Sequence, residues 1–156
     1  MQKGLATLEI VFAVLIIGLL MSATIPAVQN VTDRAALDYE TKNLYSDLRR
    51  LQATSRSGTF RNNGMGRKFS VDESLAMELS PAAASYKIVR GIEPVGQTHH
   101  MQNITNFTAP TERIVFDSNG KSNVNSGAVT LTSERGRTSK IVFDSVGRFR
   151  GGRADE

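Results

Sequence analysis

The most constraining feature of this chain is a long apolar run that begins directly after a single carboxylate. Residues 10–21 (IVFAVLIIGLLM) carry no charge and no strong hydrogen-bonding side chain, and residues 22–28 extend the run. As a helix, residues 10–28 would be about 28 Å long, close to the roughly 30 Å hydrocarbon core of a bilayer. We therefore expect a transmembrane helix over residues 5–28. Glu9 then needs a partner, because a carboxylate at the edge of the apolar run is costly alone.

Two simpler interpretations of this segment explain less. A secretory signal peptide would carry more positive charge than Lys3, and its small-residue cleavage site would follow the apolar run. An ordinary single-pass anchor is the other alternative, and it leaves Glu9 unexplained. Cleavage after Gly4 would create a positive amine on Leu5. That amine in a neighbouring copy could neutralise Glu9 and set the register between subunits.

The segment KGLATLE at residues 3–9, followed by the apolar run, resembles the leader of type IV pilins and type II secretion pseudopilins. The resemblance implies that a prepilin peptidase removes the leader, residues 1–4, by cutting after Gly4. Leu5 would then be N-methylated, and Glu9 would serve docking onto other pilin or pseudopilin subunits. It also implies a single-pass protein of the inner (cytoplasmic) membrane with an extracytoplasmic head, which later enters a surface or periplasmic filament.

The helical pattern continues beyond the apolar run but becomes amphipathic. Leu37, Leu44, Leu48 and Leu51 are spaced by seven, four and three residues, which is typical of a helix with one buried face. The charged residues of this segment, Glu40 among them, fall mostly off that stripe. We expect an amphipathic continuation of the helix over residues 29–57, ended by a Ser-Gly pair at 57–58.

The resulting fold class is α+β. A long N-terminal α-helix, half transmembrane and half amphipathic, packs on a small antiparallel β-sheet head formed by residues 58–156, as in the pilin fold. Residues 86–89 and 128–132 are expected to form strands. Residues 58–66 are turn-rich, 67–71 suit a short strand, 72–84 are ambiguous with a helical turn stopped at Pro81, and 91–110 are polar and irregular.

An internal repeat marks the C-terminal third. RIVFDSNGK at 113–121 matches KIVFDSVGR at 140–148 with an offset of 27 residues. Each copy predicts a strand followed by a turn, in which the side chain of Asp117 or Asp144 bonds the turn backbone. The simplest arrangement is one antiparallel sheet built from similar strand-turn units.

The sequence offers little for catalysis or metal binding. The chain has no cysteine, which excludes thiol chemistry, disulfides and cysteine-ligated zinc. The adjacent side chains of His99 and His100 diverge in a strand, and nothing nearby completes a metal site. The segment 117–120 lacks the spacing and later ligands of a calcium loop. With no nucleophile motif and no phosphate-binding loop, we expect no enzymatic activity, no metal and no cofactor.

The positive charge of the chain is concentrated at its C-terminus. The formal net charge is +4, and residues 135–153 contain a single acid, Asp144. In an extended chain Arg148 and Arg150 point to the same side, roughly 6.5–7 Å apart, while Phe149 points into the core. That spacing is of the order of the separation between successive phosphates along a DNA strand, and each guanidinium can fork onto a phosphate. The six cations of this region are Arg135, Arg137, Lys140, Arg148, Arg150 and Arg153.

Charge alone favours a solvated surface that keeps an exposed chain end soluble over an anion-binding patch. The chain's ending, however, is similar to the GspH/FimT family, and Gly147-Arg148-x-Arg150 matches the GRxR motif of its FimT branch. FimT-type minor pilins bind DNA in natural transformation, so the resemblance implies non-specific DNA binding through phosphate contacts at Gly147, Arg148 and Arg150. The neighbouring cations Arg135, Arg137, Lys140 and Arg153 would widen the patch. The alternative is a structural GspH-like minor pseudopilin of a type II secretion system without DNA binding.

Overall fold

The computed structural model describes residues 2–56, 75–144, 146 and 148–151, without the side chains of residues 2–7, 23–25 and 27. The chain divides into two compact units, Met1–Asp33 and Arg34–Glu156. The turn-rich segment 58–66 and the strand expected at 67–71 lie outside the described residues.

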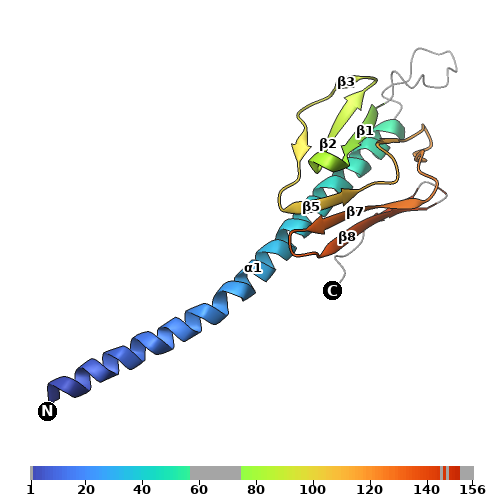
Figure 1. Ribbon diagram of the computed structural model, residues 1–156. Coiled ribbons are helices and arrows are strands. Elements are labelled where there is room, and N and C mark those ends of the chain that lie inside the picture. The colour runs from blue at the N-terminus through green and yellow to red at the C-terminus, as the bar shows by residue number, and fades with distance from the viewer. Residues whose placement is uncertain (1, 57–74, 145, 147, 152–156) are drawn as a thin grey trace, which may run out of the picture. The chain divides into compact units, whose positions relative to one another are not determined.

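Both predicted helical segments belong to one helix, α1 (Gln2–Arg56), which continues through Pro26 (Figure 1). In the N-terminal unit, every large apolar side chain described from Leu8 to Met21 is more than half exposed. Glu9 is also exposed. Among the described helical residues, no stretch is long and apolar enough to cross a membrane.

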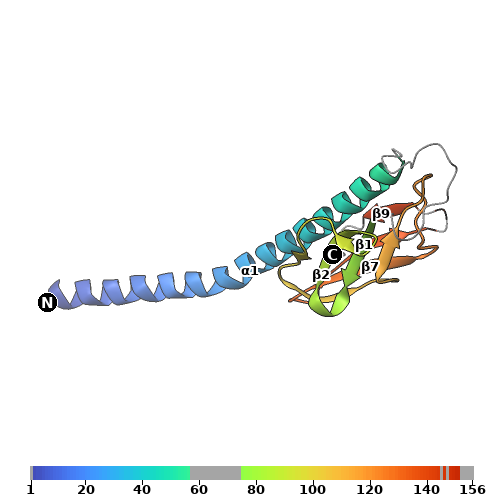
Figure 2. The same ribbon diagram turned by 90° about the horizontal axis from the view of Figure 1, so that it is seen from above.

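In the C-terminal unit the predicted leucine stripe is confirmed. Leu37, Leu44 and Leu48 are fully buried and Leu51 is 2 % exposed. Their spacing places them on one face of α1, and in both ribbon views the strands lie along this part of the helix (Figure 1, Figure 2). Glu40 departs from the prediction that the charged residues lie off the buried face, because it is 3 % exposed.

The strands form two sheets, in which all pairs are antiparallel, so the α+β class is confirmed. The first sheet has the order β3-β2-β1-β6, with β4 also paired to β2, and the second has the order β5-β7-β8-β9. The strands of the first are β1 (Leu75–Ser80), β2 (Ser85–Arg90), β3 (Glu93–Pro94), β4 (His99–His100) and β6 (Arg113–Val115). Those of the second are β5 (Ile104–Thr108), β7 (Gly127–Ser133), β8 (Thr138–Phe143) and β9 (Phe149–Gly151).

The expectation of a single sheet is therefore wrong. The first repeat copy contributes β6, which pairs with β1, whereas the second contributes β8, which pairs with β7 and β9. The two copies share a local pattern, but the sheet that each joins is decided by distant partners.

Two further expectations for the middle of the chain are also corrected. Leu75–Ser80 is the strand β1, and Pro81 begins rather than ends a helical turn, the 3-10 helix η1 (Pro81–Ala83). Proline suits a first helical position because its fixed φ is already helical and its missing N–H is not needed there. Residues 91–110, expected to be irregular, contain β3, β4 and β5. The strands expected at 86–89 and 128–132 are confirmed within β2 and β7.

One hydrophobic core joins α1 to both sheets. The leucine stripe meets Met77 and Ile114 of the first sheet and Leu131 and Phe143 of the second in a single cluster of buried side chains. Each strand of the second sheet thus has one face toward the core and one toward solvent. The cations of β8 and β9 lie on this solvent side.

Candidate nucleic-acid interface

Phe149 fixes the orientation of β9, which is the last strand of the second sheet. Its side chain is 4 % exposed, and its ring contacts Tyr45 at 5.2 Å and Phe143 at 5.6 Å between centroids. Successive side chains of a strand point to opposite faces. Burial of Phe149 therefore turns Arg148 and Arg150 outward, and both are exposed, which confirms the predicted alternation.

The turn before β9 holds the backbone of Arg148. The carboxylate Oδ1 of Asp144 accepts the N–H groups of Val146 at 3.0 Å and Arg148 at 2.8 Å, and the N–H of Asp144 donates to the carbonyl of Arg148 at 2.9 Å. Asp117 makes the same contacts with the backbone two and four positions on, at 2.9 and 2.8 Å. Both aspartates are thus turn formers, as predicted.

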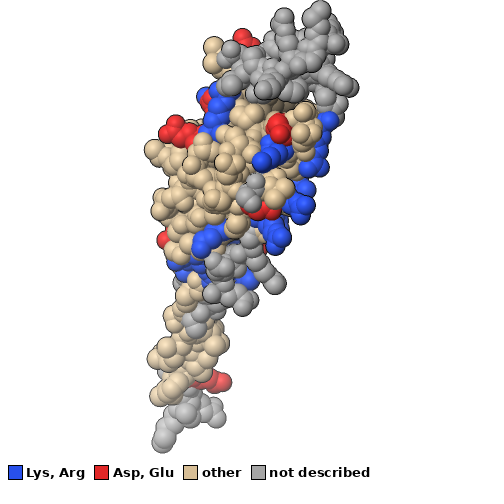
Figure 3. All heavy atoms as spheres, turned by 90° about the vertical axis from the view of Figure 1, so that its right-hand side faces the viewer, with Lys and Arg blue, Asp and Glu red and all other residues tan. Residues whose placement is uncertain are grey.

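Lys140 lies on the same face as this arginine pair. Val142 is the register partner of Arg150, and Lys140 is exposed two residues before Val142 on β8. Lys140 and Arg150 are therefore diagonal neighbours, with Cα atoms roughly 7–8 Å apart. Arg148, Arg150 and Lys140 together are called the β8–β9 patch below. In the view of Figure 3, Lys and Arg side chains lie along the right-hand margin, with smaller groups on the left.

The other predicted cations are not part of that patch. Arg135 and Arg137 lie in the β7–β8 hairpin, where the N–H of Ser133 donates to the carbonyl of Arg137 at 2.8 Å. This hairpin and the Asp144 turn are at opposite ends of β8, a separation of roughly 20 Å. Gly147 and Arg153 lie outside the described residues.

The β8–β9 patch has the chemistry of a phosphate-binding surface. Paired guanidiniums can each fork onto a phosphate oxygen pair, and Arg148 and Arg150 are both exposed. Comparisons with protein-family models, curated proteins and solved structures give no match to this chain. A functional proposal for the patch is therefore argued from its own residues.

Sequence reasoning missed Arg49 of α1, whose Cζ lies 5.2 Å from the ring centroid of Phe149. Its guanidinium also donates to the hydroxyl of Tyr45, at 2.8 Å from Nη2 and 3.1 Å from Nε. The available signal was the seven-residue spacing between Arg49 and Arg56, which places both on one helix face beside the leucine stripe. The proximity of Arg49 to β9 depends on tertiary packing and has no local signal.

Two carboxylates of α1, Glu40 and Asp47, make polar contacts with the first sheet and with Gln102, which follows β4. The buried carboxylate of Glu40 contacts His99 Nε2 at 2.7 Å and accepts the N–H of Gln102 at 3.1 Å. The Tyr86 hydroxyl donates to Asp47 Oδ2 at 2.7 Å. Burial of the phenol, this hydrogen bond and the negative charges of Asp47 and Glu40 raise the pKa of Tyr86.

The two histidines of β4 differ in their surroundings. His99 is partly buried against Glu40, whereas His100 is exposed. Within the part of the chain that the structure describes, no three His, Cys, Asp or Glu side chains are grouped so that they could hold a metal ion. His99 contacts Glu40 through Nε2 and packs beside Tyr86, whose ring lies 5.0 Å away.

Proposed function

We propose that the chain is a minor pilin-like subunit of a type IV pilus-type filament that binds DNA non-specifically during uptake in natural transformation. The observation that carries the proposal is the exposure of Arg148 and Arg150 on either side of the buried Phe149, where Arg148 directly precedes the edge strand β9 and Arg150 lies in it. Lys140 on the neighbouring strand adds a third cation to the same face.

The proposed binding mode is electrostatic. Each arginine neutralises a backbone phosphate and releases a condensed counterion, so affinity falls as salt rises. Contacts to phosphates carry no sequence information, and the patch therefore binds DNA of any sequence. The Asp144 turn holds the backbone of Arg148, and the buried Phe149 fixes the side on which both arginines lie, before DNA arrives. This ordering of the backbone reduces the entropic cost of binding.

The proposal gives the N-terminal unit the role of anchor and assembly element. A transmembrane helix over residues 5–28 is supported by the uncharged run in the sequence and by the exposure of its described apolar side chains. We expect a prepilin peptidase to cut after Gly4 and expose an amine on Leu5. In a neighbouring subunit that amine would neutralise Glu9, and a retracting filament would then pull bound DNA toward the cell.

DNA binding by the full-length chain in non-ionic detergent tests the proposal. The double variant Arg148→Ala/Arg150→Ala is compared with Arg34→Ala/Lys42→Ala, which removes the same charge from exposed positions of α1. We expect the patch variant to bind a short duplex at least tenfold more weakly in 50 mM salt. Its plot of log affinity against log salt should be shallower by about 1.8, from about 0.9 for each lost phosphate contact.

Three results would contradict the proposal. Equal loss in the patch and control variants would show that only net charge matters. Failure of the unmodified chain to bind DNA would favour the structural pseudopilin of a type II secretion system. Duplexes of unrelated sequence should bind with equal affinity, and a strong sequence preference would contradict the proposed phosphate-only contacts.

A further inference from the structure

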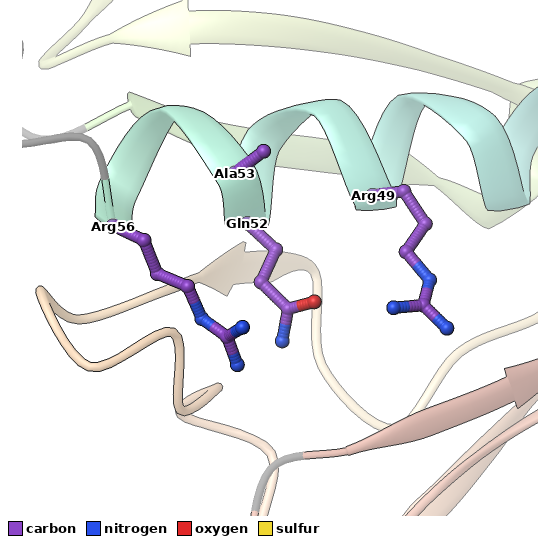
Figure 4. A pocket seen from close by; sticks show the side chains of 4 residues that line it. All are labelled: Arg49, Gln52, Ala53 and Arg56. Carbon is purple, nitrogen blue, oxygen red and sulfur yellow. The ribbon is translucent and has the colours of Figure 1, made fainter.

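The last turns of α1 line a hollow beside the turn at residues 117–120. Its volume is about 560 Å³, within the roughly 300–1,000 Å³ of ligand-binding pockets. Figure 4 shows the side chains of Arg49, Gln52 and Arg56 extending from α1 toward the neighbouring strand and loops. This hollow, lined by Arg49, Gln52, Ala53 and Arg56, is called the α1 groove.

The groove is held in shape by the Asp117 turn. Gln52 Nε2 donates to the carbonyl of Gly120 at 2.7 Å, and Arg56 Nε donates to the carbonyl of Asn119 at 3.2 Å. Gly120 has φ +74°, and a Cβ there would collide with the Arg56 guanidinium. The guanidinium therefore lies directly on the turn, with its orientation fixed by Nε.

Arg49 is oriented at the other end of the groove. The Tyr45 hydroxyl and the ring of Phe149 hold its guanidinium next to β9. No ion pair between described residues involves Arg49 or Arg56. The Asp117 carboxylate in the facing turn commits its Oδ1 to two backbone N–H groups. Two oriented guanidiniums in one hollow are an arrangement suited to an anion.

The groove and the β8–β9 patch lie on the two sides of one edge strand. Phe149 points toward Arg49, whereas the flanking Arg148 and Arg150 point outward. Positive charge thus continues around the edge of β9 from the second sheet to α1. A polyanion bound at the patch meets Arg49 and Arg56 if it follows this edge.

We infer that the α1 groove binds a backbone phosphate of the DNA held by Arg148 and Arg150. The inference rests on the proposed function and adds a second element, α1, to the binding surface. DNA then contacts the outward-facing Arg148 and Arg150 and the last turns of α1, with Arg56 as a phosphate ligand and Gln52 and Gly120 as the support that positions it.

The variant Arg56→Gln tests the groove, and Arg50→Gln is its matched control. Arg50 is exposed on the adjacent turn, does not line the groove, and carries the same charge. Glutamine at position 56 keeps a donor for the Asn119 carbonyl. With the full-length chain in non-ionic detergent and the same duplex, we expect Arg56→Gln to weaken binding at least fivefold. Arg56→Gln should also make the plot of log affinity against log salt shallower by about 0.9. Arg50→Gln should leave that slope unchanged.

The outcomes separate the groove from the proposed function. If Arg148→Ala/Arg150→Ala weakens binding while Arg56→Gln behaves like Arg50→Gln, the groove inference is wrong and the DNA-binding function stands. If the unmodified chain binds no DNA, both are wrong. The variant Arg56→Lys keeps the charge without the planar fork, so it should restore the slope but only part of the affinity.

Discussion

The surroundings of Tyr86 change the pKa of its phenol. Its side chain is 3 % exposed and its hydroxyl donates to Asp47, with Glu40 adding further negative charge. All three factors favour the neutral phenol, so its pKa is raised in the folded state. An unfolded chain has the ordinary tyrosine pKa of about 10. The contribution of Tyr86 to stability is therefore complete below pH 10 and decreases above it.

This linkage predicts how Tyr86→Phe responds to pH. At pH 8 the variant should lose about 1–2 kcal/mol of unfolding free energy, from the hydrogen bond to a carboxylate. At pH 11 that difference should be smaller by about 1.4 kcal/mol. Ionisation of the phenol then stabilises the unfolded state of the original chain, whereas the variant has no phenol at position 86. Urea unfolding at both pH values measures the difference in unfolding free energy. Ionisation of Tyr39 and Tyr45 does not affect this difference, because both proteins contain them. A difference in unfolding free energy that is the same at both pH values would contradict a raised pKa of Tyr86.

For other single residues, the sequence predicts exposure in some cases and misses burial in others. The outward direction of Arg148 and Arg150 follows from the period of a strand and the apolar Phe149 between them. The burial of Glu40 did not follow, because its partners His99 and Gln102 are about sixty residues away along the chain. A charged residue can be buried where distant groups supply hydrogen bonds, and no local pattern reports them.

At the scale of elements, the repeat shows that one local motif can serve two sheets. The turns at Asp117 and Asp144 have matching side-chain to backbone bonds. The strands before them, β6 and β8, nevertheless belong to different sheets. Turn chemistry is local and readable in the sequence, whereas strand pairing is set by which apolar faces meet in the core.

Two effects of the Asp144 side chain, its hydrogen bonds in the turn and its negative charge, can be separated by mutation. Asp144→Ala removes the acceptor of two backbone N–H groups, and we expect a loss of about 1–2 kcal/mol in unfolding free energy and weaker DNA binding. Asp144→Asn keeps an acceptor oxygen and removes the negative charge, so it should keep most of the stability and bind DNA at least as tightly. Chemical unfolding and DNA titration measure both. Tighter binding by Asp144→Ala would show that charge outweighs the positioning of Arg148.

At the scale of the whole molecule, the two units bury their apolar residues differently. The described core lies in Arg34–Glu156, where one cluster joins α1 to both sheets. In Met1–Asp33 the large apolar side chains described from Leu8 to Met21 are exposed in the single chain. Such a surface is normally covered by lipid or by other subunits, which agrees with the proposed anchor and assembly role.

The proposed processing predicts a change in mass. Co-expression with a prepilin peptidase should shorten the chain by residues 1–4 and leave a methylated amine on Leu5, as measured by intact-protein mass spectrometry. Gly4→Val should abolish cleavage. Glu9→Gln should leave cleavage intact but prevent incorporation into filaments, since it removes the partner of the Leu5 amine. An unchanged mass for the original chain would contradict the pilin-like proposal.

The sequence by itself determined the features that depend on neighbouring residues. These are the helix with its leucine stripe, the aspartate turns and the alternation around Phe149, each set by a short-range period or a side-chain to backbone bond. Only the tertiary structure decided which sheet each repeat copy joins, how Glu40 is paired, and that Arg49 lies beside β9 and Arg56 on the Asp117 turn. Those features depend on contacts between distant segments, because core packing and strand pairing are chosen by the whole chain.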